Sequence, residues 1–454
     1  MNIEKTLQQA IIHHRAGQLQ DAERLYRAIL KAQPNHPDAN HNLGLLAVGA
    51  SQPATGLPHF KLALEANPMQ GQYWLSYIDA LIQSGQNDIA RQVLAQGLKR
   101  GLQGKAVESL TTRLEGNYAL LNMIEEINNA SPLYKPTNIW QPLTLLHLER
   151  LKKHGIANFK LTLNEHYSQW AVVTIEDELR SNISNLNKDN HIVIEAAQLE
   201  SPQHFGDKNK GDLYTSYVWQ QYRYLQSKDT LGLLPLLSES LVGNPIRIRQ
   251  GNRYISQDIA LAYLDFLSIV TGLSKKLLDL PVTIAEIGAG YGCLASIFGT
   301  LSKACYWIID IPPTLYVSQS YIQALFPTDA IFKFRSFSSL GEVEAELSKA
   351  RFAFFTPNQI EMLADKSIDI FVNVDSFAEM TIPQVENYMA HARRICNQAI
   401  YLRNYDERSV SRYEGKSYPM PKKSLYHPGP LWDCIFDQDF ALTPRQFQAL
   451  YRHI

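Results

Sequence analysis

The sequence predicts a chain of three parts: an array of helical repeats, a mainly helical region, and a carboxyl-terminal α/β domain with a parallel sheet. Three observations lead to this fold class. A 34-residue repeat runs through the first hundred residues, prolines cluster after residue 130, and short apolar strands alternate with helical stretches after Leu280. The expected boundaries are 1–102 for the repeats, 103–140 for a capping helix and Pro-rich linker, 141–280 for the helical region, and 281–454 for the α/β core.

The repeat appears when Ile3, Pro37 and Gly71 are taken as equivalent starts. The superposed positions are Gly17 with Gly85, Ala22 with Ala90, Tyr26 with Phe60 and Leu94, and Pro34 with Pro68. In period and in these positions the stretch 3–102 resembles the tetratricopeptide (TPR) family, which implies an α-helical solenoid with a groove for a peptide or another subunit. An alternative is that the repeats only space or solubilise the rest of the chain. Gly56 departs from the usual alanine, and we expect Pro53 and Pro58 to interrupt the second repeat.

The boundary after the repeats is predicted from Pro132, Pro136 and Pro142, which disfavour helix over a dozen residues. The region that follows has amphipathic helical patterns at 143–155, 213–227 and 256–279. Its aromatic residues could form the wall of a sugar site, but a stripe at helical spacing is more often core; they are Tyr214, Tyr217, Trp219, Tyr222 and Tyr224.

The α/β domain is predicted from four apolar strand segments, TIAEIG, YWIID, IDIFVNV and QAIYLRN, which helical stretches separate. This alternation is typical of a parallel sheet covered on both faces. Ligands of such sheets bind beyond the carboxyl ends of the strands. The chain leaves these ends at residues 286–292, 310, 375–380 and 403–406.

The turn after the first strand reads Glu286-Ile-Gly288-Ala-Gly290-Tyr-Gly292. A dinucleotide fingerprint needs GxGxxG, and here its last position is Cys293. The string resembles the first motif of class I S-adenosylmethionine-dependent methyltransferases, with a Rossmann-like fold. In that superfamily an acidic residue at the end of the second strand accepts both ribose hydroxyls, and Asp310 stands there, 22 residues beyond Gly288.

The stretches GNPIRIRQGNRYISQDIALAYLDFLSI, IDIP, FFTPNQIEML and SIDIFVNVDSFAEM sharpen this resemblance. They are similar to the sugar O-methyltransferase family of bacterial surface-glycan gene clusters, over residues 140–430. The resemblance implies S-adenosylmethionine as cofactor, a carbohydrate or glycan-precursor acceptor, and a helical region that covers the substrate. It also implies that 375–380 faces the acceptor. The implied cofactor-binding residues are Glu286, Gly288, Ala289, Gly290, Gly292, Asp310 and Ile311.

Methyl transfer to a hydroxyl needs a group that removes the proton. The candidates are Glu379, Asp375 and, in the carboxyl-terminal segment LYHPGPLW, His427, with Asp406 also at a strand end. We favour Glu379; the alternative is a carboxylate that only faces a helix amino terminus. No trio of acidic and histidine residues has metal-ligand spacing, so no metal is expected, with magnesium on Asp375 and Glu379 as the alternative.

The composition of the chain limits the kinds of partner that we expect it to bind. The net charge of −1 over 454 residues, without a basic run, argues against nucleic acid, and no apolar stretch is long enough for a spanning helix. We expect a cytoplasmic enzyme whose four cysteines are free thiols, and a protein partner for the repeats. Two other readings stay open: a nicotinamide-dependent oxidoreductase, and an adaptor that binds S-adenosylmethionine without chemistry.

Overall fold

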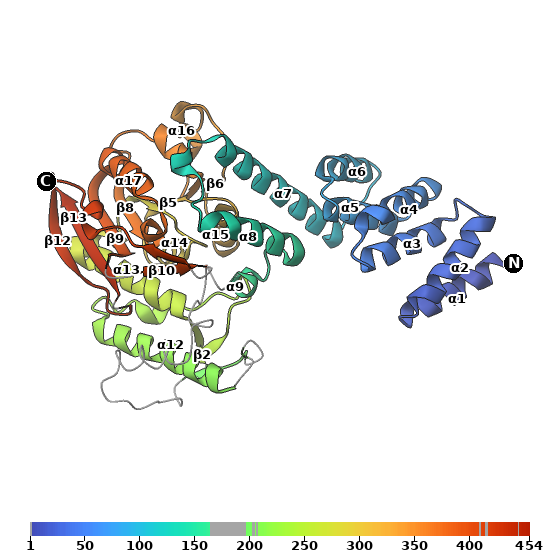
Figure 1. Ribbon diagram of the computed structural model, residues 1–454, viewed down its shortest axis with the longest axis horizontal. Coiled ribbons are helices and arrows are strands. Elements are labelled where there is room, and N and C mark those ends of the chain that lie inside the picture. Colours follow the sequence, from blue (N-terminus) through green and yellow to red (C-terminus); the bar gives the residue numbers. More distant parts are fainter. Residues whose placement is uncertain are drawn as a thin grey trace. The chain divides into compact units, whose positions relative to one another are not determined.

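The computed structural model describes residues 2–163, 197–201, 205, 208–407, 410–413, 416–443 and 445–454 (Figure 1). The chain divides into two compact units, Met1–Leu121 and Asn122–Ile454. None of the helices in the described parts is long and apolar enough to cross a membrane.

The first unit consists of helices that pack as consecutive antiparallel pairs. The pairs are α1 (Ile3–Arg15) with α2 (Leu19–Ala32), α3 (Pro37–Gly49) with α4 (Pro53–Ala66), and α5 (Gly71–Gln83) with α6 (Asn87–Lys99), and α7 (Lys105–Asn129) follows them. The starts of the first helices, Ile3, Pro37 and Gly71, are 34 residues apart, as are those of the second helices. Val107, Leu110 and Leu114 of α7 join the apolar cluster of the third pair.

The second pair packs closely because two glycines face each other. A Cβ on Gly44 would lie 2.6 Å from the ring of Phe60, and a Cβ on Gly56 would lie 2.9 Å from the Gly44 carbonyl oxygen. The prolines do not interrupt this repeat, contrary to the sequence expectation. Pro53 occupies the first turn of α4, where a missing N–H costs nothing, and Pro58 lies inside the helix without ending it.

The second unit begins with the end of α7 and a mainly helical stretch. Its described elements are η1 (Pro132–Tyr134), α8 (Trp140–His154), α9 (Phe159–Thr162), β1 (Gln198–Leu199), α12 (Lys208–Lys228), η4 (Leu234–Leu236), β2 (Ile248–Gln250), β3 (Arg253–Ile255), α13 (Gln257–Leu273) and η5 (Lys275–Leu278). Strands β1, β2 and β3 form a small antiparallel sheet. On α12 the side chains of Tyr214, Tyr217 and Tyr222 are fully buried in the core, so this stripe is packing.

An eight-stranded sheet forms the centre of this unit. The strands are β4 (Thr283–Ile287), β5 (Cys305–Ile309), β6 (Ile331–Phe332), β7 (Phe352–Phe355), β8 (Ile368–Val374), β9 (Cys396–Tyr405), β12 (Trp432–Asp439) and β13 (Gln446–His453). Their order is β12-β13-β9-β8-β4-β5-β7-β6. The four predicted strand segments are β4, β5, β8 and β9, and the sequence prediction of these strands is confirmed.

The sheet is mixed, which corrects the expectation of a parallel sheet. The six strands from β9 to β6 are parallel, but β13 runs antiparallel to both β9 and β12. Strands β12 and β13 are joined by the short connection 440–445, and a connection of that length reverses the chain. The order also changes direction at β4, whose neighbours are β5 on one side and β8 on the other.

Helices cover both faces of the sheet, in agreement with the alternation of strands and helices in the sequence (Figure 1). Ile284, Ile308 and Val372 pack with α13, α14 (Cys293–Leu301) and α15 (Thr314–Leu325) on one face. Ala285, Ile309 and other alternate residues pack with α17 (Ile382–Ile395) on the other. The shorter elements are η6 (Leu340–Glu342), α16 (Glu344–Leu347), η7 (Pro357–Met362), η8 (Ser376–Glu379), β10 (Val410–Tyr413), β11 (Lys416–Pro419) and η9 (Lys423–Tyr426).

The Pro-rich segment 132–142 was expected to be a linker but is part of the second unit. Tyr134 is buried in the apolar cluster on the α17 face, and its hydroxyl donates to Glu361 Oε1 at 2.7 Å. Gln384 Nε2 of α17 donates to the Lys135 carbonyl oxygen at 2.9 Å. Proline clusters disfavour helix, but they do not prevent an extended segment from packing on a domain.

Candidate active site

A cavity of about 270 Å³ lies at the carboxyl ends of the parallel strands. Its lining comes from the residues that follow β4, β5 and β8, from Arg403 of β9, from α13 and α17, and from the segment 134–140. The strand order reverses between β4 and β8, and open α/β sheets bind ligands at such a point.

The glycine-rich turn after β4 depends on glycine at three positions for different reasons. Gly288, Gly290 and Gly292 all have positive φ, of 71°, 59° and 87°. A Cβ on Gly288 would lie 2.3 Å from Ser376 Cβ, so the turns after β4 and β8 meet there. A Cβ on Gly290 would meet no protein atom within 4 Å, and Gly290 lines the cavity together with Ala289.

Gly292 differs from the sequence expectation of a cofactor-binding residue. It precedes α14 and is not part of the cavity lining; a Cβ there would lie 3.2 Å from Ile308 Cδ1. The absence of a side chain at Gly292 allows the turn to pack closely against the core. The sequence could not separate this role from that of Gly290, because both lie in one glycine string.

Asp310 follows β5 and is bound to the glycine turn. Its Oδ2 accepts the Gly290 N–H at 2.9 Å, and its Oδ1 accepts the N–H of Ile311, which also lines the cavity, at 2.7 Å. Burial raises the pKa of Asp310 to about 8, although the two backbone N–H groups act in the opposite direction. Each oxygen keeps a lone pair for a further donor.

Glu286, the last acidic residue of β4, also lines the cavity but is 3% exposed. Its Oε2 accepts the Tyr306 hydroxyl at 2.8 Å, and burial raises its pKa to about 8. The Glu286 carboxyl group is therefore a fixed part of the cavity wall at the end of β4.

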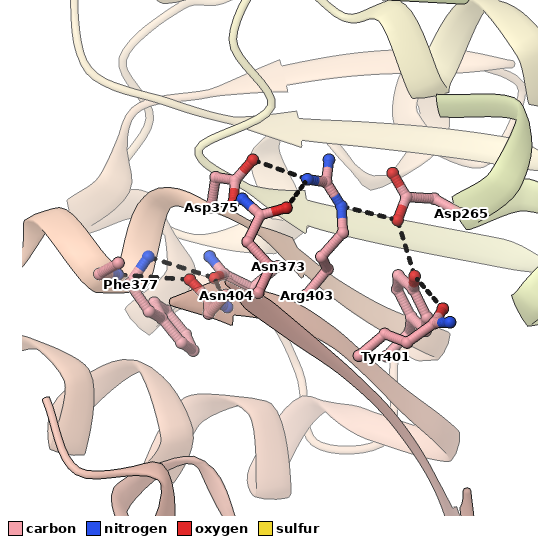
Figure 2. A network of polar contacts seen from close by, with 10 residues as sticks. Asp265, Asn373, Asp375, Phe377, Tyr401, Arg403 and Asn404 are labelled. Atoms are coloured by element: carbon pink, nitrogen blue, oxygen red, sulfur yellow. Dashed lines mark hydrogen bonds and ion pairs between the residues drawn. The ribbon is translucent and has the colours of Figure 1, made fainter. Parts of the chain in front are cut away.

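A network of polar side chains, buried except for the partly exposed Asp375, supports the wall of the cavity beside β8 and β9, as Figure 2 shows. Arg403 Nε donates to Asp265 Oδ1 at 2.9 Å and its Nη1 donates to Asp375 Oδ2 at 2.9 Å. Gln446, the first residue of β13, accepts from Arg403 Nη1 at 2.7 Å and donates to Asp375 Oδ1. Tyr401 donates to Asp265 Oδ1 at 2.7 Å. The carboxylates raise the pKa of Arg403, so it is charged at all physiological pH values.

A second set of amides fixes the turn after β8. Asn373 Nδ2 donates to the Ile287 carbonyl oxygen at 2.9 Å, and Asn404 Nδ2 donates to Asn373 Oδ1 at 2.9 Å (Figure 2). The Phe377 N–H donates to Asn373 Oδ1 and the Ala378 N–H donates to Asn404 Oδ1, each at 3.3 Å. The turn can therefore hold Asp375 at a positive φ of 64°, a strained conformation for a residue with a side chain.

Of the three predicted catalytic residues, the structure brings two together at the cavity. Glu379 and Asp375 line it, whereas His427 is exposed, and its Nδ1 accepts the Gly429 N–H at 3.0 Å. His427 is not part of the cavity lining and lies on the segment that leads into β12. Asp375 is held through both oxygens by Arg403 and Gln446, which makes it a support of the wall.

Glu379 lines the cavity and is held by a hydrogen bond to one of its oxygens. Trp140 Nε1 donates to its Oε2 at 2.7 Å, and burial raises the pKa of Glu379 to about 7. Catalytic bases work best with a pKa near the operating pH.

Carboxyl groups dominate the charge around the cavity. Six line it, namely Asp258, Asp265, Glu286, Asp310, Asp375 and Glu379, against the cations Lys135 and Arg403. No group of three or more His, Cys, Asp or Glu side chains among the described residues is arranged to hold a metal ion. A cationic ligand would favour the ionised forms of these carboxyl groups, against the burial that raises the pKa of Glu286 and of Asp310 to about 8.

Sequence reasoning missed several residues of the site. Trp140 and Tyr134 come from a segment read as a linker, and Asp265 comes from a helix with an apolar pattern. Gln446 lies on a strand that was not predicted. A single acidic residue within an apolar helical pattern, as in IALAYLDFLSIV, is the signal that could have indicated Asp265.

No protein-family model and no curated protein sequence matches this chain. Solved methyltransferases resemble part of it. Phosphoethanolamine N-methyltransferase 1 of Haemonchus contortus is 16% identical with a TM-score of 0.31, and the match covers 44% of this chain and 43% of that one. Magnesium protoporphyrin IX methyltransferase of Synechocystis PCC 6803, solved with S-adenosylmethionine, is 10% identical with a TM-score of 0.30, over 44% and 83%. A methyltransferase of Aquifex aeolicus is 10% identical with a TM-score of 0.25, over 39% and 85%. We base the functional argument on the topology and the cavity.

Proposed function

We propose that this chain is an S-adenosylmethionine-dependent O-methyltransferase that acts on a hydroxyl group of a sugar or glycan precursor. The order of the strands carries the proposal. Counted along the chain without the short edge strand β6, the central strands have the order 3-2-1-4-5-7-6, with strand 7 reversed. This is the order of class I methyltransferases. The dinucleotide-binding sheet has the order 3-2-1-4-5-6 and lacks the inserted strand, which disfavours the oxidoreductase.

The residues of the cavity fit S-adenosylmethionine. The open space beside Gly290 admits a ligand against the backbone, and Asp310 has one lone pair on each oxygen for the two ribose hydroxyls. Hydroxyl donors favour the ionised carboxylate, which offsets the burial that raises the pKa of Asp310. The carboxyl groups of the lining suit the positive sulfonium in their ionised forms, which the bound cation would itself favour.

The bound cofactor would supply an electrophilic methyl group, and the protein would supply alignment and a base. Glu379 lies at the turn after β8, on the same cavity as the glycine turn. A neutral hydroxyl reacts poorly unless its proton is taken as the carbon–oxygen bond forms, and a positioned base contributes on the order of 100-fold to 10,000-fold. The sugar as acceptor class rests on the sequence resemblance over 140–430.

For the first unit we propose a tetratricopeptide module that binds a protein partner. The 34-residue interval of the helix starts and the contact of Phe60 with Gly44 support this. Removal of residues 1–121 should leave methyl transfer to a free acceptor intact and abolish partner capture. Loss of methyl transfer to the free acceptor would show instead that the module serves the chemistry.

The test of the enzyme is transfer of a labelled methyl group from S-adenosylmethionine to extracted surface glycans. Glu379→Gln keeps size but cannot take a proton at neutral pH, so label incorporation at saturating S-adenosylmethionine should fall about 100-fold. His427→Ala is the matched control and should be as active as the wild type, because His427 lies outside the cavity. Full activity of Glu379→Gln would remove the proposed base, and cofactor binding without transfer to any acceptor would favour the adaptor.

A further inference from the structure

Trp140 and Glu379 meet at the cavity although they are 239 residues apart in the sequence. The indole N–H donates to Glu379 Oε2 at 2.7 Å, and both residues line the cavity. Glu379 Oε1 accepts no hydrogen bond from any residue within the described ranges. One oxygen of the carboxylate is thus held and the other is open to a bound acceptor.

The segment before α8 is itself held in place by the second unit. Tyr134 donates to Glu361 Oε1 at 2.7 Å and contacts His391 Nε2 at 2.9 Å. Its ring packs edge-on against Tyr388 at 5.9 Å between centroids, and the Lys135 carbonyl accepts from Gln384. These contacts fix the backbone that carries Trp140, so the indole N–H has a defined direction.

We propose that Trp140 is a positioning residue that orients Glu379 for proton abstraction, and that the segment 134–140 forms the wall of the acceptor side of the cavity. This inference rests on the proposed methyltransferase function. A hydrogen bond from an indole to a carboxylate fixes the rotamer of the base and leaves its second oxygen to accept the acceptor hydroxyl.

The hydrogen bond from Trp140 shifts the pKa of Glu379 in a known direction. A donor to the ionised form of a carboxyl lowers its pKa, and Trp140 acts in this way against the burial that raises the pKa of Glu379 to about 7. Loss of the donor should therefore raise this pKa. The other charged and titratable groups that line the cavity with Glu379 are Lys135, Asp258, Asp265, Glu286, Asp310, Asp375 and Arg403, the phenols Tyr134, Tyr291 and Tyr388, and the thiol Cys293. None of them changes in a Trp140 variant.

The first experiment needs no cofactor. The indole ¹⁵N–H signal of Trp140, assigned by its loss in Trp140→Phe, should titrate with a midpoint near pH 7 in the full-length wild type. It should lose that titration in Glu379→Gln. A Trp140 signal that is independent of pH in the wild type would overturn the inference, whatever the protein does with S-adenosylmethionine.

The second experiment measures binding of S-adenosylmethionine by calorimetry between pH 5.5 and 8.5. Ionised Glu379 attracts the sulfonium, so wild-type affinity should rise with pH through about 7, and Glu379→Gln should lack this component. Trp140→Phe should raise the midpoint of this pH dependence by about one pH unit. The variant removes one hydrogen bond to the ionised carboxylate, and the free energy of an ordinary hydrogen bond corresponds to about one pKa unit. Trp432→Phe, outside the cavity, is the control and should keep the wild-type midpoint. An unchanged midpoint in Trp140→Phe overturns this inference alone, whereas no binding by the wild type overturns the proposed function with it.

Discussion

Gly290 combines two properties, a positive φ and an open space on the cavity side. Gly290→Val should lower S-adenosylmethionine affinity by more than 100-fold, because the branched side chain would occupy the space of the ligand. Gly251→Val is the matched control: Gly251 also has a positive φ, 56°, and open space, but it is not part of the cavity lining. Equal losses of affinity in the two variants, measured by calorimetry, would trace the effect to backbone strain.

Glu286 predicts a pH dependence of stability. Its pKa is raised to about 8 in the folded protein, so the folded state binds a proton that the unfolded state releases near pH 4.5. This contribution is present at low pH and is lost as the pH rises through about 8. Glu286→Gln keeps an acceptor for Tyr306, so its thermal midpoint should exceed that of the wild type by more at pH 8.5 than at pH 5. A difference between the two melting temperatures that stays constant from pH 5 to pH 8.5 would contradict the raised pKa of Glu286.

At the scale of elements, the wall of the cavity depends on the pairing of α13 with β9. Asp265 and Arg403 are 1% and 5% exposed in their side chains and are joined at 2.9 Å. Arg403→Met should lower the free energy of unfolding by about 3–5 kcal/mol, because Asp265 would remain buried without its cation. Adding Asp265→Asn should recover part of the loss, which urea unfolding of the two variants can measure. No recovery in the double variant would mean that the stability depends on packing of Arg403 against Phe440, whose ring centroid lies 4.5 Å from the guanidinium carbon.

The sequence predicted the elements whose local pattern is strong. IDIFVNV and TIAEIG are apolar runs between turn signals, and both are strands at the centre of the sheet. Strand β12 was missed because WDCIFDQD carries charges along an edge strand with an exposed face. Strand β13 was missed because the buried polar residues Gln446 and Gln448 interrupt its apolar pattern. The place of the segment around Trp140 in the site was missed because a cluster of prolines indicates only that helix is disfavoured. It gives no information on which part of the protein the segment packs against.

At the scale of the whole molecule, the boundary between the units lies before the prolines. Met123 is fully buried in the core of the second unit, and Glu126 accepts from Asn358 Nδ2 at 2.8 Å and from Ser336. A chain that starts at Asn122 should therefore fold and melt near the temperature of the full-length second unit. One that starts at Pro132 lacks these contacts and should melt several degrees lower. Identical melting curves of the two truncated chains would show that residues 122–131 add nothing to the second unit.

The most direct measurement of the central claim is equilibrium titration of the full-length protein with S-adenosylmethionine and, separately, with NAD. We expect saturable one-to-one binding of S-adenosylmethionine and no heat of binding with NAD, because Cys293 occupies the last position of the GxGxxG dinucleotide fingerprint and the sheet has the inserted strand β13 that the dinucleotide-binding sheet lacks. Binding of NAD, or the absence of S-adenosylmethionine binding by a folded protein, would contradict it.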